Sequence, residues 1–476
     1  NETKANKISQ DAIVSDEDHS FRLSRTVEDM QLTSKIREKS IRFDSIFYTN
    51  WGLRTGTAKK TKKYIVETGT DPNSHAMVRG EDIVEGYRLQ EPSEYIIYEK
   101  EDLYNAMFEE LFESNKIIFR KISGSGLMAV ADKNEYYCFS TLIPCVNIQK
   151  IKHVDRTGIP EGTPESKAYD DIYYALAIVN SSLLEWFYQV NLSDDLSVVP
   201  GHINEIPIAE ITNIDAEVDT ERLNALIDKS QVAVQDNISV DSVISVIGDE
   251  LDNNNDRLIH DILSNLAQMN SNFHSTHESL NLRLPDYLGS YDEDLTISNV
   301  GFVQPQTGSA DSILRQTTKQ KPYLRAGKAV INRISRDTVE VFLTAEYKPD
   351  PDKMGKDSYT ETDPIPALRI IDLQEPEADL IEAFVPVAVE KAEGFAGFYD
   401  YATKTNSLLD RLKDIVLPNL DDVADGIEEY KKTTERAEEL DRKIKQIERL
   451  IDEIVYELYG LTDEEIEIVE DVVSKD

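Results

Sequence analysis

The sequence predicts an α+β protein: a mixed, β-rich domain, then a helical spacer, a small β-containing region and a C-terminal helical or coiled-coil region. Three observations predict this class. Residues 41–210 contain short β-branched and aromatic runs separated by Gly, Pro, Asn and Asp turns. Residues 211–285 have amphipathic helical spacing, and the final part of the chain has apolar residues at alternating intervals of three and four.

Composition shifts divide the chain into five parts. These are a connector (1–40), the β-rich domain (41–210), a helical region (211–285), a small β-containing region (286–366) and a C-terminal helical region (367–476). The chain starts at Asn1 without a methionine, which favours a connector from something upstream. The stretch 348–366, rich in Pro, Asp, Lys and Thr, predicts an exposed loop.

Length and composition indicate a soluble, cytoplasmic protein. The chain has 476 residues, with 40% hydrophobic and 30% charged residues, and no apolar run long enough to cross a membrane. No signal pattern is present at the N-terminus. The two cysteines, Cys138 and Cys145, lie in one β-rich stretch, so we interpret them as small buried hydrophobic residues.

The charge balance is strongly acidic. There are 90 Asp and Glu residues against 51 Lys and Arg, a formal net charge of -39, and the acid is spread along the chain. Such a surface is typical of a protein that stays hydrated in concentrated salt, so we expect a halophilic archaeal source. The alternative is an ordinary acidic protein with a basic partner.

The stretch 116–148 predicts strands at 117–122, 127–131 and 136–148, joined by turns. It carries Arg120 and Lys121, and no acidic residue occurs between Glu113 and Asp132. This local absence of acid favours a surface that meets a negative partner. The alternative is a three-stranded piece of core with two solvated basic residues.

Two other windows are basic and free of acid, between Asp44 and Glu67 and between Asp311 and Asp337. Exposed cations on loops attract phosphate and reach base edges, so we interpret both windows as DNA-facing. The alternative is that the lysines pair with acidic neighbours elsewhere in the fold. The candidate cations are Arg54, Lys59, Lys60, Lys62 and Lys63 in the first window, and Arg315, Lys319, Lys321, Arg325 and Lys328 in the second.

Helical patterns occur at 21–37, 101–113, 169–188, 221–234 and 257–266. A seam of apolar residues then continues near the C-terminus, followed by Gly460 as a helix end and Thr462 and Glu465 as a capping box. Because only about three heptads are present, an intramolecular helical hairpin is favoured over a dimer zipper. The seam is formed by Ala437, Leu440, Ile444, Ile447, Ile451, Ile454 and Leu458.

Catalytic patterns are scarce. The chain has no phosphate-binding Gly-Lys loop and no Cys/His metal spacing, and Gly124-x-Gly126 lacks the third glycine of a dinucleotide site. Asp337, Glu346 and Lys348 resemble the carboxylates and lysine of a metal-dependent nuclease, a pattern that arises easily by chance in so acidic a chain. We expect no catalytic or metal-binding residue in this chain.

The order of several segments resembles the TaqI-like C-terminal specificity domain of adenine-N6 DNA methyltransferases and fused type IIG restriction-modification enzymes. The segments are WGLRTG at 51–56, MVRGEDI at 77–83, YIIY at 95–98, KIIFRKI at 116–122, NSSLL at 180–184 and IPI at 206–208. The C-terminal part resembles the ends of the same enzymes from haloarchaea, through GFAGF at 394–398, ATKTN at 402–406 and LIDEIVYELYGLT at 450–462.

The catalytic motif of these enzymes contains a Pro-Pro pair, and this chain has none, so the family's catalytic motif is missing here. The resemblance therefore implies that double-stranded DNA is the partner, and that S-adenosylmethionine belongs to a methyltransferase domain located upstream or on another chain. That domain would flip the adenine, within a system of restriction or phage defence. It implies DNA reading by Arg54, Lys59, Lys60, Arg120 and Lys121, with Ser123 and Ser125 in the adjoining turn. A non-catalytic adaptor that binds a partner through its C-terminal helices remains the alternative.

Overall fold

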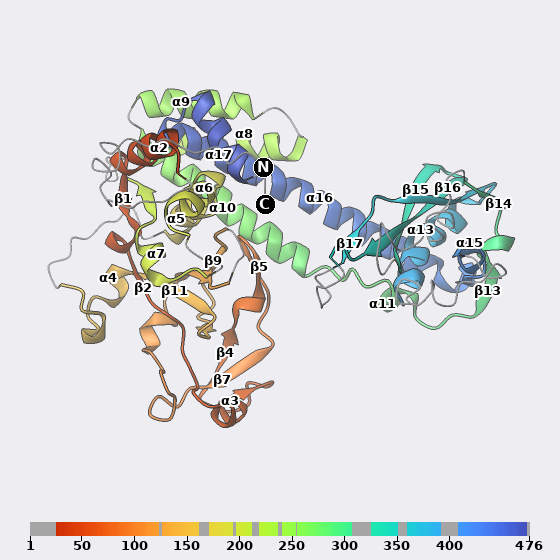
Figure 1. Ribbon diagram of the computed structural model, residues 1–476, viewed down its shortest axis with the longest axis horizontal. Coiled ribbons are helices and arrows are strands. Elements are labelled where there is room, and N and C mark those ends of the chain that lie inside the picture. The colour runs from red at the N-terminus through yellow and green to blue at the C-terminus, as the bar shows by residue number, and fades with distance from the viewer. Residues whose placement is uncertain are drawn as a thin grey trace. The chain divides into compact units, whose positions relative to one another are not determined.

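The computed structural model describes residues 25–122, 126–160, 171–193, 197–211, 219–236, 240–253, 255–306, 325–350, 359–391 and 408–473. The chain divides into two units, Asn1–Ser279 with Glu439–Asp476, and Leu280–Glu438. Figure 1 shows strands and helices mixed within each unit, which confirms the α+β class. The five-part division drawn from composition stays a prediction.

The central sheet of the first unit has the strand order β2-β11-β8-β9, all antiparallel. Its strands are β2 (Phe47–Thr49), β11 (Leu142–Asn147), β8 (Lys116–Arg120) and β9 (Ala129–Asp132). Strand β11 is buried along its length and β8 is buried except at Arg120. Both strands are apolar on both faces because the sheet is covered on both sides.

A second four-stranded sheet has the order β10-β4-β7-β3. It contains β10 (Tyr137–Cys138), β4 (Ser74–Val78), β7 (Glu94–Ile97) and β3 (Ile65–Val66), and only the β10–β4 pair is parallel. Two small antiparallel pairs complete the strands, β5 (Ile83–Glu85) with β6 (Arg88–Leu89) and β1 (Ser40–Arg42) with β12 (Pro207–Ala209).

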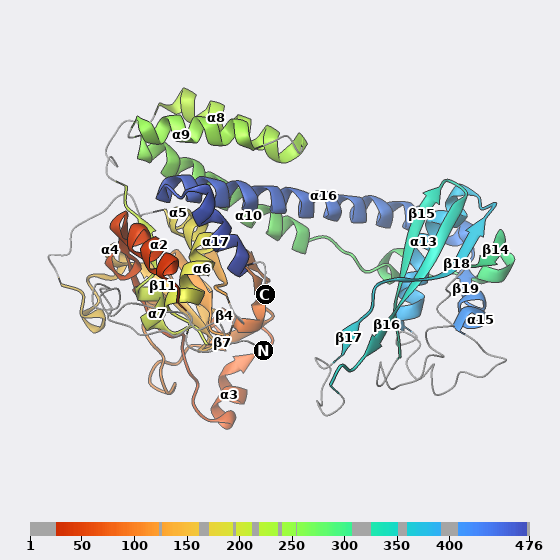
Figure 2. The ribbon, with the colours of Figure 1, turned by 45° about the horizontal axis from the view of Figure 1, so that its top comes forward.

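Helices of the first unit pack around α5 (Ile172–Val179), in which every residue is buried. It contacts α10 (Asp256–Glu278) and β9, and Figure 2 shows it among helices and strands. The remaining helices are α2 (Val27–Glu38), α3 (Ala58–Tyr64), α4 (Ile148–Ile151), α6 (Ser182–Asn191), α7 (Pro200–Asn204), α8 (Thr220–Asp236), α9 (Asp241–Asp252), the end of α16 (Leu420–Tyr459) and α17 (Asp463–Val473).

Two helix predictions were wrong in detail. The pattern at 169–188 forms two helices, because Ser181 caps α6 by accepting from Leu184 N at 3.4 Å. The pattern at 101–113 forms turns and a short 3-10 helix, Glu109–Leu111. There Met107 adopts a positive φ of 62° and the Asn105 backbone pairs with Arg54, both of which are incompatible with a continuing helix.

The second unit contains the sheet β14-β18-β16-β15, with β17 (Thr360–Glu361) paired to β16. Its strands are β14 (Phe302–Pro305), β18 (Ile365–Ile371), β16 (Thr338–Tyr347) and β15 (Arg325–Ser335). Helix α13 (Glu375–Lys391) contacts β15 and β16. A β13 (Glu293–Thr296) and β19 (Val416–Pro418) pair, α11 (Pro285–Leu288), α15 (Leu408–Lys413) and the start of α16 also belong to it.

The predicted apolar seam lies along α16, and Ile447, Ile451 and Ile454 are buried in the core of the first unit. Gly460 adopts the expected positive φ of 65° after the helix. Thr462 N donates to Glu465 at 2.8 Å and Thr462 Oγ1 accepts from Glu465 N at 3.4 Å, which confirms the capping box. The seam is thus used inside the chain, as the intramolecular interpretation requires.

Both cysteines are buried, as expected, and burial raises the pKa of Cys138 to about 12. In the described part of the chain, no helix is long and apolar enough to cross a membrane.

Candidate nucleic-acid interface

The first basic window lies on a loop and the short helix α3, beyond strands β4 and β7 in both views (Figures 1 and 2). At Gly52 the loop lies directly against the backbone of Cys138 and Phe139, so a Cβ at this position would lie 2.3 Å from the two carbonyl oxygens. Leu53 N donates to Cys138 O at 2.8 Å and Arg54 pairs through its backbone with Asn105. A rigid base therefore carries the basic residues that follow.

Helix α3 begins where Thr57 accepts from Lys60 N at 3.4 Å. Gly56 precedes it with a φ of +101°, a conformation that favours glycine. The buried Thr55 hydroxyl lies 2.7 Å from the Thr61 hydroxyl and ties the loop to the helix. The sequence TGT at 55–57 thus fixes the direction in which the lysines of α3 project.

The five cations of this window are exposed, but they do not all have the same surroundings. Lys63 Nζ donates to Tyr64 Oη at 2.6 Å and lies 3.7 Å from Asp102, and Lys60 Nζ donates to the Asp102 carbonyl. The Tyr64 hydroxyl, followed by Asp102, raises the pKa of Lys63. Lys63 therefore lies beside an acidic side chain and Lys60 is held by a backbone carbonyl, whereas the side chains of Arg54, Lys59 and Lys62 are exposed to solvent.

Arg120 and Lys121 lie elsewhere on the domain and are engaged in the fold. Arg120 is half-buried and its Nη1 donates to Ile83 O at 2.8 Å. Lys121 Nζ lies 4.9 Å from the centre of the Trp51 ring, a cation–π contact. Both assignments to DNA remain predictions, and both side chains would have to leave these partners to reach a base. Ser123 and Ser125 lie outside the described residues.

The second basic window belongs to the second unit. Lys328 is exposed and its Nζ lies 3.7 Å from Glu361, while Arg325 begins β15. Arg315, Lys319 and Lys321 lie outside the described residues. Because Lys328 is the one residue of the five whose side chain is described, the assignment of this window to DNA stays a prediction.

The fold separates the carboxylates of the suspected nuclease triplet, Asp337, Glu346 and Lys348. Asp337 lies in the turn before β16, whereas Glu346 is near the other end of that ten-residue strand. At about 3.3 Å per residue, nine residues of strand separate the two carboxylates by roughly 30 Å. No group of three or more His, Cys, Asp or Glu residues placed to hold a metal ion occurs among the described residues.

One exposed aromatic residue was missed at the sequence level. Tyr104 is 76% exposed, and its Cβ lies about 3.0 Å from where a Cβ on Gly56 would stand, beside the basic loop. An exposed aromatic ring next to cations is able to stack on a nucleobase. Its sequence neighbourhood, EDLYN at 101–105, is acidic and gives no such signal.

A β-rich lobe that carries solvent-facing cations on a rigid base is the kind of surface that recognition domains for nucleic acids present. Residues 75–208, from β4 to β12, match the model of the TaqI-like C-terminal specificity domain. This segment is therefore similar to a TaqI-like C-terminal specificity domain. The match confirms the resemblance over residues 75–208 and begins after the basic loop, whose neighbouring strand β3 pairs with β7 of the matched segment.

Among solved structures, the chain is similar to the S subunit of a type I restriction-modification system from M. genitalium. The two are 10% identical over 87% of this chain and 95% of that one, with a TM-score of 0.39. This TM-score is too low for the likeness to carry weight. No curated protein sequence matches the chain.

Proposed function

We propose that this protein reads a short DNA sequence for an adenine-N6 methyltransferase of a restriction-modification system, used against foreign DNA. The observation that carries the proposal is the match of residues 75–208 to a specificity domain. The enzyme would be of the type IIG kind or a methyltransferase with a separate specificity part. The chain itself would not be catalytic.

The charge distribution supports contact with DNA. In a chain of net charge -39, Arg54, Lys59 and Lys62 present positive charge to solvent on one rigid loop and helix. At roughly 1 M salt the Debye length is about 3 Å, so these cations would act at contact distance and give little long-range steering. The acidic remainder of the surface then costs little affinity, which is compatible with a halophilic source.

The chemistry would be supplied by a separate methyltransferase domain that holds S-adenosylmethionine and receives the flipped adenine. This chain would hold the duplex in register for that domain. Phosphate contacts would come from the α3 lysines, and base contacts from Arg54 and the side chains around it.

The proposal is tested by selecting binding sites for the purified chain from random duplexes in molar KCl. We expect one short enriched sequence. The double variant Lys59→Glu with Lys62→Glu should weaken binding to that site at least tenfold and lower the salt slope by about two, one for each phosphate contact. Lys445→Glu, an exposed lysine on α16, serves as the matched control and should bind like the unmodified chain.

The outcome that contradicts the proposal is no enriched sequence, or equal binding by the double variant and the control. Arg120→Ala is not a clean test of DNA binding, although the resemblance implies that Arg120 reads DNA. Its hydrogen bond to Ile83 O means that the variant would disturb the fold as well as any DNA contact.

An adaptor that binds a partner through its C-terminal helices is less favoured. The apolar seam that such a helix would offer is occupied, since Leu440, Ile447 and Ile454 are fully buried. Co-purification with a methyltransferase chain in the absence of any sequence-specific DNA binding would favour the adaptor.

A further inference from the structure

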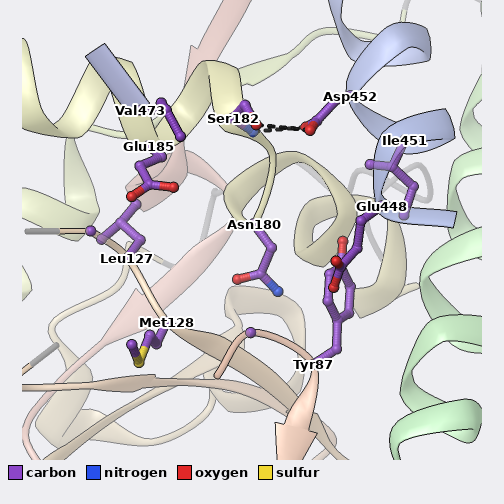
Figure 3. Close-up of a pocket in the computed structure, with 12 residues that line it drawn as sticks. Tyr87, Leu127, Met128, Asn180, Ser182, Glu185, Glu448, Ile451, Asp452 and Val473 are labelled. Carbon is purple, nitrogen blue, oxygen red and sulfur yellow. Dashed lines mark hydrogen bonds between the residues drawn. The ribbon is translucent and has the colours of Figure 1, made fainter. Parts of the chain in front are cut away.

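A cavity of about 460 Å³ lies inside the first unit, away from the basic loop. Figure 3 shows side chains from three regions meeting there: Tyr87 from the turn between β5 and β6, Glu185 near the start of α6, and Glu448 with Asp452 from α16. Leu127, Met128 and Ile451 supply apolar surface. The cavity thus combines three carboxyl groups with an apolar lining.

Asp452 connects α16 to the beginning of α6. Its carboxylate accepts from Ser182 N at 2.7 Å and from Ser182 Oγ at 2.8 Å, the dashed contacts in Figure 3. Desolvation raises the pKa of Asp452 to about 7, and the nearby charge of Glu448 acts in the same direction. Near neutral pH this side chain therefore exists in both protonation states.

Tyr87 is the unusual member of the lining. The residue is only 5% exposed, adopts a positive φ of 64°, and its hydroxyl has no hydrogen-bond partner among the described residues. Asn180 lies near. Its Oδ1 accepts from Ala129 N at 3.1 Å and one of its two amide N–H groups donates to Ala129 O at 2.9 Å, and its effect on the pKa of Tyr87 is the smallest of those that act on this hydroxyl. A buried hydroxyl without a partner is costly, so the cavity provides a polar atom that a ligand would satisfy.

The surroundings of this hydroxyl are negative. Desolvation, and then the charges of Glu448 and Asp452, raise the pKa of Tyr87 well above its ordinary value. The phenol therefore stays neutral and offers its oxygen to a donor. A ligand that suits these groups brings N–H donors and positive charge, because carboxylates are acceptors only.

We propose that this cavity binds an alkylammonium group, carried by a small amine or by a lysine side chain. An ammonium has three donors for the Tyr87 oxygen and the carboxylates of Glu448 and Asp452. The alkyl chain would pack on Leu127, Met128 and Ile451. A bare metal ion suits the site less, since the described carboxylates do not come together as a metal-ligand group.

The site is independent of DNA recognition, so either proposal can fail alone. Several titratable groups lie near Asp452. They are Glu448 and Glu453 on α16, Glu185 on α6, Tyr87 on the β5–β6 turn, Tyr456 on α16, and His274 on α10, whose Nε2 lies 3.8 Å from Glu448.

Calorimetric titration of the full chain with putrescine at pH 8 and fixed KCl tests the proposal. We expect saturable binding of putrescine and none of 1,4-butanediol, which has the same length without charge. Binding should weaken about tenfold at pH 6, because protonation of Asp452 removes an acceptor. N-acetyl-lysine amide, titrated in parallel, distinguishes a side-chain ligand from a free amine by which of the two binds more tightly.

Variants locate the site. Tyr87→Phe removes only the hydroxyl and should weaken putrescine binding about five- to tenfold, and Asp452→Asn at least tenfold. Glu448→Gln replaces either variant if it fails to fold, and Glu457→Gln, an exposed carboxylate on α16, is the matched control. Equal binding of putrescine and butanediol, or unchanged binding by folded Tyr87→Phe and Asp452→Asn, would overturn the proposal.

Discussion

The buried ion pair at the start of β8 permits a quantitative test of the fold. Lys116 Nζ lies 2.5 Å from Asp132 Oδ2, both side chains are 0% exposed, and the two residues are cross-strand partners of β8 and β9. Lys116 Nζ also donates to the Phe112 carbonyl, and Asp132 accepts from Asn134 N at 2.7 Å and Tyr136 N at 3.0 Å. All charges in the pair are therefore satisfied inside the protein.

Removing one partner leaves the other charge buried, which costs about 3–5 kcal/mol of unfolding free energy. We therefore expect Lys116→Met and Asp132→Asn each to destabilise the first unit by about that amount. The double variant should lose only about 1–3 kcal/mol, because no charge remains and the amide oxygen introduced by Asp132→Asn still accepts from one of the two turn amides. The resulting coupling energy is roughly 3 kcal/mol or more.

Urea unfolding followed by tryptophan fluorescence reports on the unfolding of the first unit, because the two tryptophans, Trp51 and Trp186, both lie in it. The surface pair Arg42–Asp44, at 2.9 Å and with side chains 59% and 36% exposed, is the matched control. Its coupling should stay below about 1 kcal/mol and fall with added KCl, whereas the buried coupling should not change. A coupling below about 1 kcal/mol for Lys116 and Asp132 would refute the reasoning.

Three further outcomes follow from the sequence and the structure. If the acidic surface is an adaptation to salt, the free energy of unfolding should rise from about 0.2 to about 3 M KCl, and a flat or falling curve contradicts the halophilic interpretation. The folded-state pKa of Asp452, about 7, lies above its unfolded value, so its contribution to stability is complete below about pH 4 and is lost as the pH rises through 7. Asp452→Asn should therefore make the free energy of unfolding, measured with urea, depend less on pH between about 4 and 7. An unchanged pH dependence in this variant would contradict the assigned pKa. Gly52→Ala should cost about 1–3 kcal/mol by fluorescence-detected unfolding, since its Cβ would meet two backbone carbonyls, whereas Gly201→Ala, with open space around it, should be neutral.

Sequence patterns were most informative where local chemistry decides the structure. The β-branched run at 117–122 became β8, Gly460 follows the end of α16, and the Thr462 box precedes α17 as expected. Local patterns failed at 101–113, where backbone pairing with a distant segment, Arg54 with Asn105, overrides the helical spacing.

The candidate site was foreseeable only in part. A run without acid identifies cations, but it does not say which of them the fold engages. Arg120 meets a carbonyl and Lys121 a ring, whereas Lys59 and Lys62 face solvent. Tyr104 and the cavity around Tyr87 depend on segments far apart in the chain, for which no local pattern exists.

The hydrogen bonds from Ser182 to Asp452 join residues 270 positions apart, and Tyr459 Oη donates to Pro207 O across a similarly long part of the sequence, at 3.0 Å. During synthesis at about 5–20 residues per second, α6 therefore emerges from the ribosome roughly 15–50 s before its capping carboxylate. Until then, the apolar surface that Ile447, Ile451 and Ile454 later cover is open to water. We expect the specificity domain to remain incomplete on the ribosome, in a state that chaperones can bind, until the end of α16 has been made.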